Sequence, residues 1–206
     1  MTRPPRPSLF YSLIAAASWP ILRIVFRYRA FGREHLPPQG GFVIAAGHAS
    51  NFDPWPLALS LWPHRFLRFM AKSELFWPPL GWLISACGAF KVRRGKADEE
   101  AMRTAIELAR TGHAVAMFPE GTRRAKGLRK TRVAHAHTGA ARIALEAGVP
   151  LIPAGIAGTD GLRRLAQLKV RYGAAIPLDD IRDDPEAARL ATDRLMAAIG
   201  ELEASL

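Results

Sequence analysis

The sequence Phe42-Val43-Ile44-Ala45-Ala46 is an uninterrupted apolar run, and the polar stretch Gly47-His48-Ala49-Ser50-Asn51-Phe52-Asp53-Pro54 follows it directly. Because the turn residues Gln39-Gly40-Gly41 precede the run, it is predicted to be a buried strand. Asp53 followed by Pro54 is typical of a helix start, with the aspartate as N-cap, and a helix is predicted through Leu61. A strand, a polar loop and a helix in this order indicate an α/β fold.

Short apolar runs alternate with helical periodicity along the rest of the chain. Strands are predicted over residues 65–70, 89–93, 114–118, 151–156 and 169–172, and helices over 75–86, 98–110, 139–147 and 184–202. This order predicts an α/β protein with a mixed, mostly parallel sheet flanked by helices. Ligands bind such sheets outside the carboxyl ends of the strands. His48 and the later stretch from Phe118 to Arg123 both follow predicted strands, so they are expected to share one crevice if those strands run parallel.

The amino-terminal segment is basic and rich in proline over residues 1–7 and largely apolar from Ser8 to Leu22. The apolar part is too short to span a bilayer before Arg23, and Pro20 lies within it. We therefore expect an amphipathic helix that lies in the membrane interface, with arginines facing lipid headgroups. The alternative is an amphipathic helix that packs on its own domain. Cleavage as a signal peptide is disfavoured because arginines follow the apolar part at once.

The composition suits a single domain with a sizeable core, because the chain has 206 residues and contains no linker, internal repeat or low-complexity block. Lysines and arginines number 29 against 18 acidic residues, which gives a net charge of +11. An anionic partner is therefore expected: a phosphorylated small molecule, an anionic lipid or a nucleic acid. The single cysteine, Cys87, rules out an intramolecular disulfide and a cysteine-based zinc cluster, and it is expected to be an inert core thiol.

Two places in the sequence indicate acid–base chemistry beside an anion site. His48 can accept a proton near neutral pH, and the carboxylate of Asp53 can hold its imidazole in one tautomer. One carboxylate oxygen is expected to accept from backbone amides and the other from the imidazole. Arg123, beside Gly121 and Thr122, is suited to binding phosphate. The sequence contains no Gly-x-Ser-x-Gly motif, and no protein nucleophile is predicted.

Four blocks occur in order along the chain: His48 to Asp53, Val92-Arg93-Arg94, Phe118 to Arg123 and Val149-Pro150-Leu151-Ile152-Pro153. This set resembles the four blocks of the lysophospholipid acyltransferase family, whose best-known members are the 1-acyl-sn-glycerol-3-phosphate acyltransferases. The resemblance runs from about residue 31 to residue 173. It implies an acyltransferase domain over residues 31–206, preceded by an N-terminal amphipathic, membrane-associating segment over residues 1–30. It further implies an O-acyltransferase of phospholipid biosynthesis that transfers a fatty acyl group from acyl-CoA or acyl carrier protein to the free hydroxyl of lysophosphatidic acid.

The resemblance also implies roles for particular residues. His48 is the general base and Asp53 the acid that orients it, so that the two form the catalytic pair. The residues expected to bind the phosphate of the substrate are Lys72, Arg93, Arg94, Glu120, Gly121, Thr122 and Arg123. The expected partners are a lysophospholipid acceptor, the acyl thioester donor and an anionic membrane surface, without a metal or a further cofactor. The implied location is the cytoplasmic side of the cell membrane, as a peripheral or monotopic protein.

The sequence is compatible with several alternatives. Gly47, Arg124 and the stretch His137-Thr138-Gly139 depart from the usual family pattern, so the acceptor could instead be glycerol-3-phosphate, a lyso-ornithine lipid or a glycolipid. A non-catalytic anionic-lipid-binding protein would explain the charge but not the catalytic pair. Nucleic-acid binding is disfavoured because the basic run after residue 122 lacks interleaved aromatic residues and a known binding motif. Core packing is the expected role of four tryptophans, with contact to lipid as the alternative: Trp55, Trp62, Trp77 and Trp82.

Overall fold

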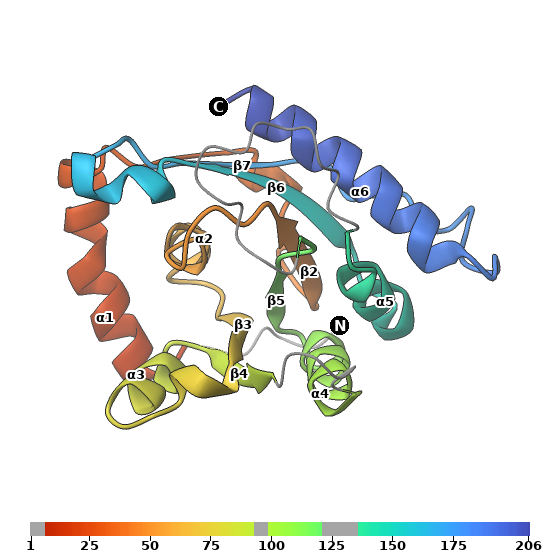
Figure 1. Ribbon diagram of the computed structural model, residues 1–206, viewed down its shortest axis with the longest axis horizontal. Helices are drawn as coiled ribbons and strands as arrows, with labels where there is room; N and C mark the ends of the chain where they lie inside the picture. Colours follow the sequence, from red (N-terminus) through yellow and green to blue (C-terminus); the bar gives the residue numbers. More distant parts are fainter. Residues whose placement is uncertain (1–6, 93–98, 121–135) are drawn as a thin grey trace.

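The computed structural model describes residues 7–92, 99–120 and 136–206. Within them the chain forms a seven-stranded sheet in the order β1-β7-β6-β2-β5-β3-β4 (Figure 1). The strands are β1 (Arg29–Phe31), β2 (Phe42–Ala46), β3 (Leu67–Lys72), β4 (Ala89–Val92), β5 (Ala114–Met117), β6 (Leu151–Ala157) and β7 (Lys169–Tyr172). Strands β6, β2, β5, β3 and β4 run parallel, whereas β7 pairs antiparallel with β6 and β1 pairs parallel with β7. The predicted mixed, mostly parallel sheet is confirmed.

Helices cover both faces of this sheet (Figure 1). The α-helices are α1 (Leu9–Pro20), α2 (Pro54–Leu61), α3 (Leu80–Ala86), α4 (Glu99–Arg110), α5 (Gly139–Ala147) and α6 (Ala187–Ala204). Shorter helical segments are η1 (Ile21–Val25), η2 (Arg33–His35), η3 (Ser73–Leu75) and η4 (Thr159–Arg164). Helices α4, α5 and α6 pack on one face, and α2 packs on the other, where α1 in turn covers α2.

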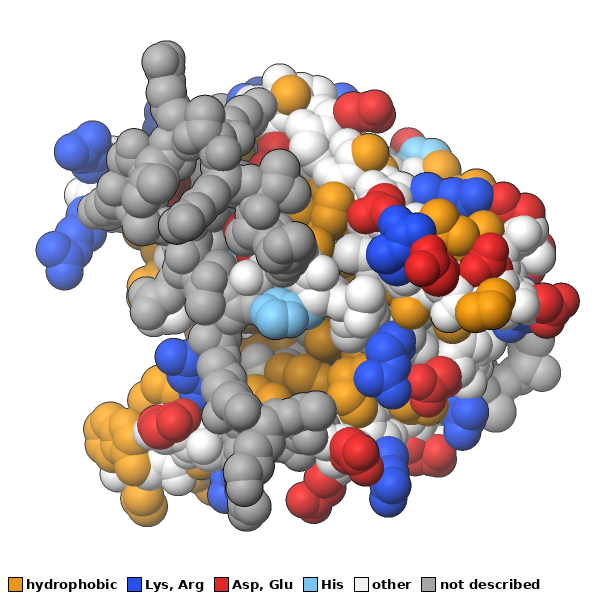
Figure 2. Space-filling model, turned by 45° about the vertical axis from the view of Figure 1, so that its right-hand side comes forward, with side chains coloured by type: hydrophobic (Ala, Val, Ile, Leu, Met, Phe, Trp, Pro, Cys, Tyr) orange, Lys and Arg blue, Asp and Glu red, His pale blue; other side chains and the backbone are white. Residues whose placement is uncertain are grey.

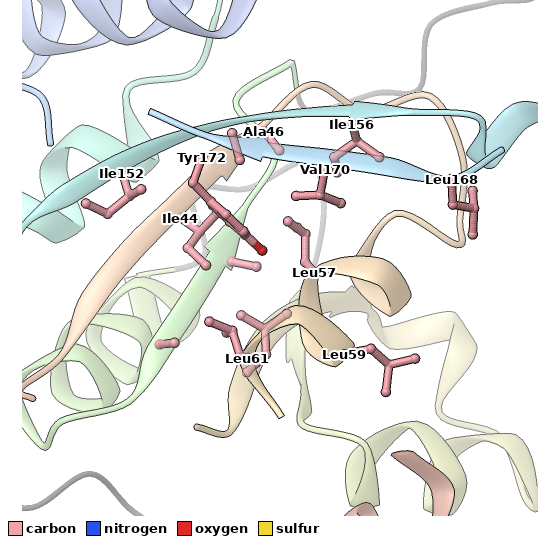
Figure 3. Close-up of a cluster of buried hydrophobic side chains, with 14 of the residues drawn as sticks. Ile44, Ala46, Leu57, Leu59, Leu61, Ile152, Ile156, Leu168, Val170 and Tyr172 are labelled. Carbon is pink, nitrogen blue, oxygen red and sulfur yellow. The ribbon is translucent and has the colours of Figure 1, made fainter. Parts of the chain in front are cut away.

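Strand β2 lies near the centre of the sheet and is buried at every position. Phe42, Ile44 and Ala46 belong to the apolar cluster beneath α2, whereas Val43 and Ala45 belong to the cluster beneath α4, α5 and α6. Figure 3 shows the first cluster, in which leucines of α2 meet side chains of β2, β6 and β7. Because both faces of a largely parallel sheet are covered, its central strand must be apolar throughout, as the sequence of β2 is.

Most predicted elements lie within a few residues of their expected bounds, and the differences have local causes. Strand β1 is not predicted because its three residues are too few to show a period. Helix α3 begins at Leu80 instead of residue 75, because Pro78 and Pro79 interrupt a helix before that point. Helix α6 begins at Ala187 instead of residue 184, because the Asp184 carboxylate accepts from the Glu186 amide at 2.7 Å and holds a turn there.

Helix α1 carries apolar side chains on both of its faces. Tyr11 and Ala15 are buried, and the Tyr11 hydroxyl donates to the Ala58 carbonyl of α2 at 3.4 Å. On the outer face Leu9 is 78% exposed and Leu13 is 60% exposed. This differs from the amphipathic helix that the sequence predicts, because the side turned away from the domain is apolar as well. Among the described residues, no helix has both the length and the apolar character needed to cross a membrane.

The predicted core role of the tryptophans is wrong for two of them. Trp55 and Trp62 pack against the core cluster, whereas Trp77 is 56% exposed and Trp82 is 67% exposed. Trp82 lies on α3, where its ring meets that of Phe10 on α1 with centroids 4.8 Å apart. The short helix that holds Trp82 is therefore attached to α1 at the surface and leaves much of its indole uncovered.

Leu57 is a buried residue of α2, the helix that begins directly after Asp53. Its substitution measures how much the packing of α2 on the sheet contributes to stability. Leu57 is fully buried, so we expect Leu57→Ala to lower the free energy of unfolding by about 2–5 kcal/mol, through lost burial and the cavity left behind. The exposed Leu9→Ala is the matched control, with an expected change below about 0.5 kcal/mol. Chemical denaturation of both variants measures the difference, and equal losses would contradict this packing.

Candidate active site

The loop after β2 and the chain after β5 leave the sheet at the same edge. Strands β2 and β5 are parallel neighbours, with Ala45 beside Met117. His48 and Phe118 consequently meet, and their rings stack with centroids 4.5 Å apart and planes 26° from parallel. The sequence-based expectation that these two stretches adjoin at the carboxyl ends of parallel strands is thus met for His48 and Phe118.

His48 and Asp53 form a close pair within the loop. The Nδ1 atom of His48 lies 2.8 Å from Oδ2 of Asp53. The Asp53 side chain is fully buried and the His48 side chain is 12% exposed. An ionised carboxylate only accepts hydrogen bonds, so this contact places a proton on Nδ1 and leaves the lone pair of a neutral imidazole on Nε2.

Asp53 also holds the backbone of its own loop. Its Oδ2 accepts from the amides of Ala49 and Ser50, each at 2.9 Å, in addition to the His48 contact. Its Oδ1 accepts from the hydroxyl of Thr159 at 2.5 Å. The amides and the imidazole therefore share one oxygen, whereas the sequence predicts that they divide between the two.

The predicted capping role of Asp53 is wrong. Asp53 occupies the N-cap position of α2, but its side chain makes no capping hydrogen bond. The physical reason is its backbone, which is already helical with φ −55° and ψ −37°, whereas a capping side chain needs an extended residue. The carboxylate turns back to the preceding loop as a result. Of the two amides that an N-cap side chain can reach, that of Trp55 donates to the Phe52 carbonyl, and Pro56 has none.

Thr159 is a site residue that the sequence analysis does not identify. It is the first residue of η4 and is 2% exposed. A signal for it exists in the sequence, because Thr159 follows the carboxyl end of a predicted strand, as His48 does. This position predicts that Thr159 lies at the edge of the sheet, but it does not predict its hydrogen-bond partner. The hydroxyl reaches Asp53 only because β6 pairs beside β2.

The structure describes two of the seven residues that are predicted to bind phosphate, Lys72 and Glu120. Glu120 is described and buried, two positions after Phe118. Lys72 is exposed at the carboxyl end of β3, which is the neighbour of β5, so it leaves the same edge of the sheet as His48. The remaining phosphate-binding candidates lie outside the described residues: Arg93, Arg94, Gly121, Thr122 and Arg123.

Two further features bear on the chemistry of this site. Partial burial raises the pKa of the Cys87 thiol, which disfavours the reactive thiolate. Within the described ranges, histidine, cysteine and acidic side chains nowhere gather in a group of three or more suited to a metal ion. The structure places behind His48 a buried carboxylate, and no other described residue forms a hydrogen bond with its imidazole. Such an imidazole can accept a proton on Nε2, and the carboxylate can stabilise the imidazolium that results.

The known proteins that this chain resembles are acyltransferases. A model of the family described as Acyltransferase matches residues 27–157. The 1-acyl-sn-glycerol-3-phosphate acyltransferase of Bacillus subtilis is 31% identical over 204 residues, which cover 95% of this chain and 98% of that protein. The chloroplastic 1-acyl-sn-glycerol-3-phosphate acyltransferase BAT2 of Brassica napus is 33% identical over 132 residues, which are 62% of this chain and 36% of that protein.

A solved structure has the same fold. The crystal structure of the 1-acyl-sn-glycerophosphate (LPA) acyltransferase PlsC from Thermotoga maritima superposes with a TM-score of 0.66 at 24% sequence identity. The match covers 94% of this chain and 78% of that one. It therefore extends over the α/β sheet and most of the helices around it.

The four contacts of Asp53 predict different outcomes for two substitutions. Asp53→Ala leaves buried donors without a partner, so we expect a loss of about 2–4 kcal/mol in the free energy of unfolding. Asp53→Asn keeps an acceptor for the loop amides and can donate its NH₂ to the Thr159 oxygen, so we expect a loss below about 1.5 kcal/mol. Urea denaturation of the two variants checks this order. A larger loss for asparagine than for alanine would contradict the hydrogen bonds described here.

Proposed function

Because this chain belongs to the Acyltransferase family, we propose that it transfers a fatty acyl group from acyl-CoA or acyl carrier protein to the free hydroxyl of lysophosphatidic acid. Family membership makes the chain an acyltransferase enzyme. The acceptor is proposed from the relatives, since the Bacillus subtilis protein that matches over 98% of its length is named a 1-acyl-sn-glycerol-3-phosphate acyltransferase. The net charge of +11 is consistent with an anionic acceptor.

The observation that carries the proposal is the contact of His48 with the buried Asp53. In the proposed reaction, Nε2 of His48 accepts the proton of the acceptor hydroxyl as its oxygen attacks the thioester carbonyl carbon. The tetrahedral intermediate then collapses, the carbon–sulfur bond breaks, and the leaving thiolate takes the proton back from the imidazolium. Asp53 stabilises the imidazolium in between, and Phe118 keeps the ring plane in place by stacking.

The phosphate of the acceptor is proposed to bind at the same edge of the sheet. Lys72 lies two strands away from β2, a separation of roughly 10 Å, and its flexible side chain can extend toward a phosphate bound between the two strand ends. Glu120 precedes the proposed phosphate-binding residues Gly121, Thr122 and Arg123 directly. Arg93 and Arg94 follow β4, which pairs with β3 so that Val92 lies beside Lys72. These positions favour a cationic rim beside His48 as the acceptor site.

A second part of the proposal is that the enzyme works on a membrane surface. Leu9, Leu13, Ile21 and Ile24 are exposed on the outer side of α1 and η1, at intervals that align them along one side of a helix. The exposed Trp77 and Trp82 of the adjoining α3 region extend the apolar surface, and indoles are favoured at a lipid interface. Arg23 and Arg27 are exposed beside it and suit anionic headgroups.

The side of the molecule opposite α1 and α3 carries charged side chains instead of an apolar surface (Figure 1 and Figure 2). Figure 2 shows acidic and basic side chains interspersed over the side on which α5 and α6 lie. Ion pairs join Arg142 to Glu146 on α5 at 3.4 Å and Arg194 of α6 to Asp180 at 2.6 Å. Mixed charge of this kind is suited to water, so the contrast favours docking through α1 and α3. A peripheral or monotopic place on the cytoplasmic side of the cell membrane is proposed accordingly.

The reaction is tested by a panel of acceptors incubated with labelled acyl-CoA or acyl carrier protein, with products identified by mass. We expect transfer to lysophosphatidic acid, and His48→Ala should reduce its rate at least about 100-fold, since the proton acceptor is lost. The exposed His64, beyond the end of α2, provides the matched control, and His64→Ala should keep full activity.

Other members of the panel distinguish the alternatives. Glycerol-3-phosphate, a lyso-ornithine lipid and a monoacylglycerol vary the headgroup while the chemistry stays the same. A preference for the uncharged monoacylglycerol would contradict the acceptor assignment. Rapid turnover by a folded His48→Ala protein would contradict the general-base role. If the wild type transfers no acyl group to any acceptor, the protein is better explained as a non-catalytic anionic-lipid-binding protein.

Membrane docking is tested by changing the outer side of α1 and η1 while their buried side stays intact. We expect the triple variant Leu9→Ser, Leu13→Ser, Ile24→Ser to bind phosphatidylglycerol vesicles at least about tenfold more weakly than the wild type, because three exposed apolar side chains are lost. The paired control Ala197→Ser, Ala204→Ser, at exposed positions of α6, should bind like the wild type. Co-sedimentation measures binding, and equal binding by the triple variant would contradict docking through α1 and η1.

A further inference from the structure

Thr159 makes a close contact with Asp53 from a distant part of the chain. Its hydroxyl lies 2.5 Å from Oδ1 of Asp53, and the two residues are 106 positions apart in the sequence. Both side chains are buried, with Thr159 at 2% exposure and Asp53 at 0%. A carboxylate oxygen cannot donate, so the threonine hydroxyl is the donor in this hydrogen bond.

The lengths of two neighbouring strands bring Thr159 to this place. Ala154 of β6 lies beside Ala46, the last residue of β2. Strand β6 continues to Ala157, so it extends roughly 10 Å beyond the end of β2 and along the loop that holds His48.

The backbone at Gly158 then directs the chain to Asp53. Gly158 has φ +89°, and a Cβ built on it would lie 2.2 Å from the Gln167 carbonyl oxygen, so only glycine fits the turn. Gly158 thereby turns the chain into η4, with Thr159 as its first residue.

We propose that Thr159 is a positioning residue for acyl transfer, which acts by fixing the orientation of the Asp53 carboxylate toward His48. This inference rests on the proposed roles of His48 and Asp53. The three other donors, His48 and the amides of Ala49 and Ser50, all bind Oδ2. Thr159 is the donor that the described residues supply to Oδ1, so it sets the rotation of the carboxylate about its Cβ–Cγ bond.

The threonine also satisfies a buried acceptor. Without its hydroxyl, Oδ1 would have to turn toward the loop amides to find a donor, because a buried charged oxygen without a partner is costly. Such a rotation would move Oδ2 away from Nδ1 of His48. The imidazole would then lose the contact that leaves Nε2 free to accept the hydroxyl proton.

Two substitutions separate the hydrogen bond from the shape of the side chain. Thr159→Val keeps the volume and removes the donor, and we expect kcat to fall about ten- to a hundredfold while KM changes less than about twofold, because Thr159 makes no proposed contact with substrate. Thr159→Ser keeps the donor and should retain kcat within about threefold. Introduced into an Asp53→Ala background, Thr159→Val should lower kcat by less than about threefold further, because the side chain through which Thr159 acts has already been removed.

A spectroscopic measurement tests the same inference without substrate. In protein labelled with ¹⁵N-histidine, the Nδ1 proton of His48 should give a protected, low-field resonance in the wild type and in Thr159→Ser. In Thr159→Val the resonance should be lost to exchange with water, because the carboxylate no longer holds that proton. The same resonance in the valine variant as in the wild type would overturn the proposal.

The kinetic results can overturn the proposal independently. Unchanged kcat in Thr159→Val, or equal losses in the valine and serine variants together with lower melting temperatures, would make Thr159 a packing residue only. If the wild type transfers no acyl group to any acceptor, the proposed function fails, while the histidine resonance still reports whether Thr159 positions the pair.

Discussion

The buried carboxylate of Asp53 is the interaction on which the rest of the site depends. A charge with no exposure to water is costly unless donors surround it. Here an imidazole, two loop amides and a hydroxyl donate to it. These donors come from the loop after β2 and from the chain after β6, while Asp53 itself directly precedes α2. One side chain thus fixes three segments relative to one another, and the orientation of His48 follows from that arrangement.

The sheet makes this arrangement possible, because the chain leaves its parallel strands at a common edge. His48 follows β2, Phe118 follows β5 and Thr159 follows β6, and these three strands are neighbours. The length of each strand sets how far its chain reaches, so the longer β6 extends past the shorter β2. Helix α2 then leads back along the sheet, held by leucines that pack on β2 and β7 (Figure 3).

The amino-terminal helix is linked to the same centre. Tyr11 donates to a carbonyl of α2, and the Tyr28 hydroxyl donates to the Pro56 carbonyl at 2.8 Å, only three residues after Asp53. Phe26 and Trp55 meet edge to face with centroids 6.0 Å apart. The exposed apolar side of α1, which is proposed to dock on lipid, therefore lies one helix away from the proposed catalytic pair of His48 and Asp53.

The sequence alone determined much of this protein, because the signals involved are local. An apolar run predicted β2, Asp53-Pro54 predicted the start of α2, Gly148 predicted the end of α5, and the alternation of strands and helices predicted a mostly parallel sheet. The carboxyl ends of two predicted strands also placed His48 beside the chain after β5. Local patterns did not reveal that Asp53 leaves α2 uncapped, that Trp77 and Trp82 are exposed, or that Thr159 donates to Asp53. Only the tertiary structure decided these, because backbone angles at a helix start, the covering of a surface and a contact across 106 residues depend on which strands become neighbours and how far each one extends.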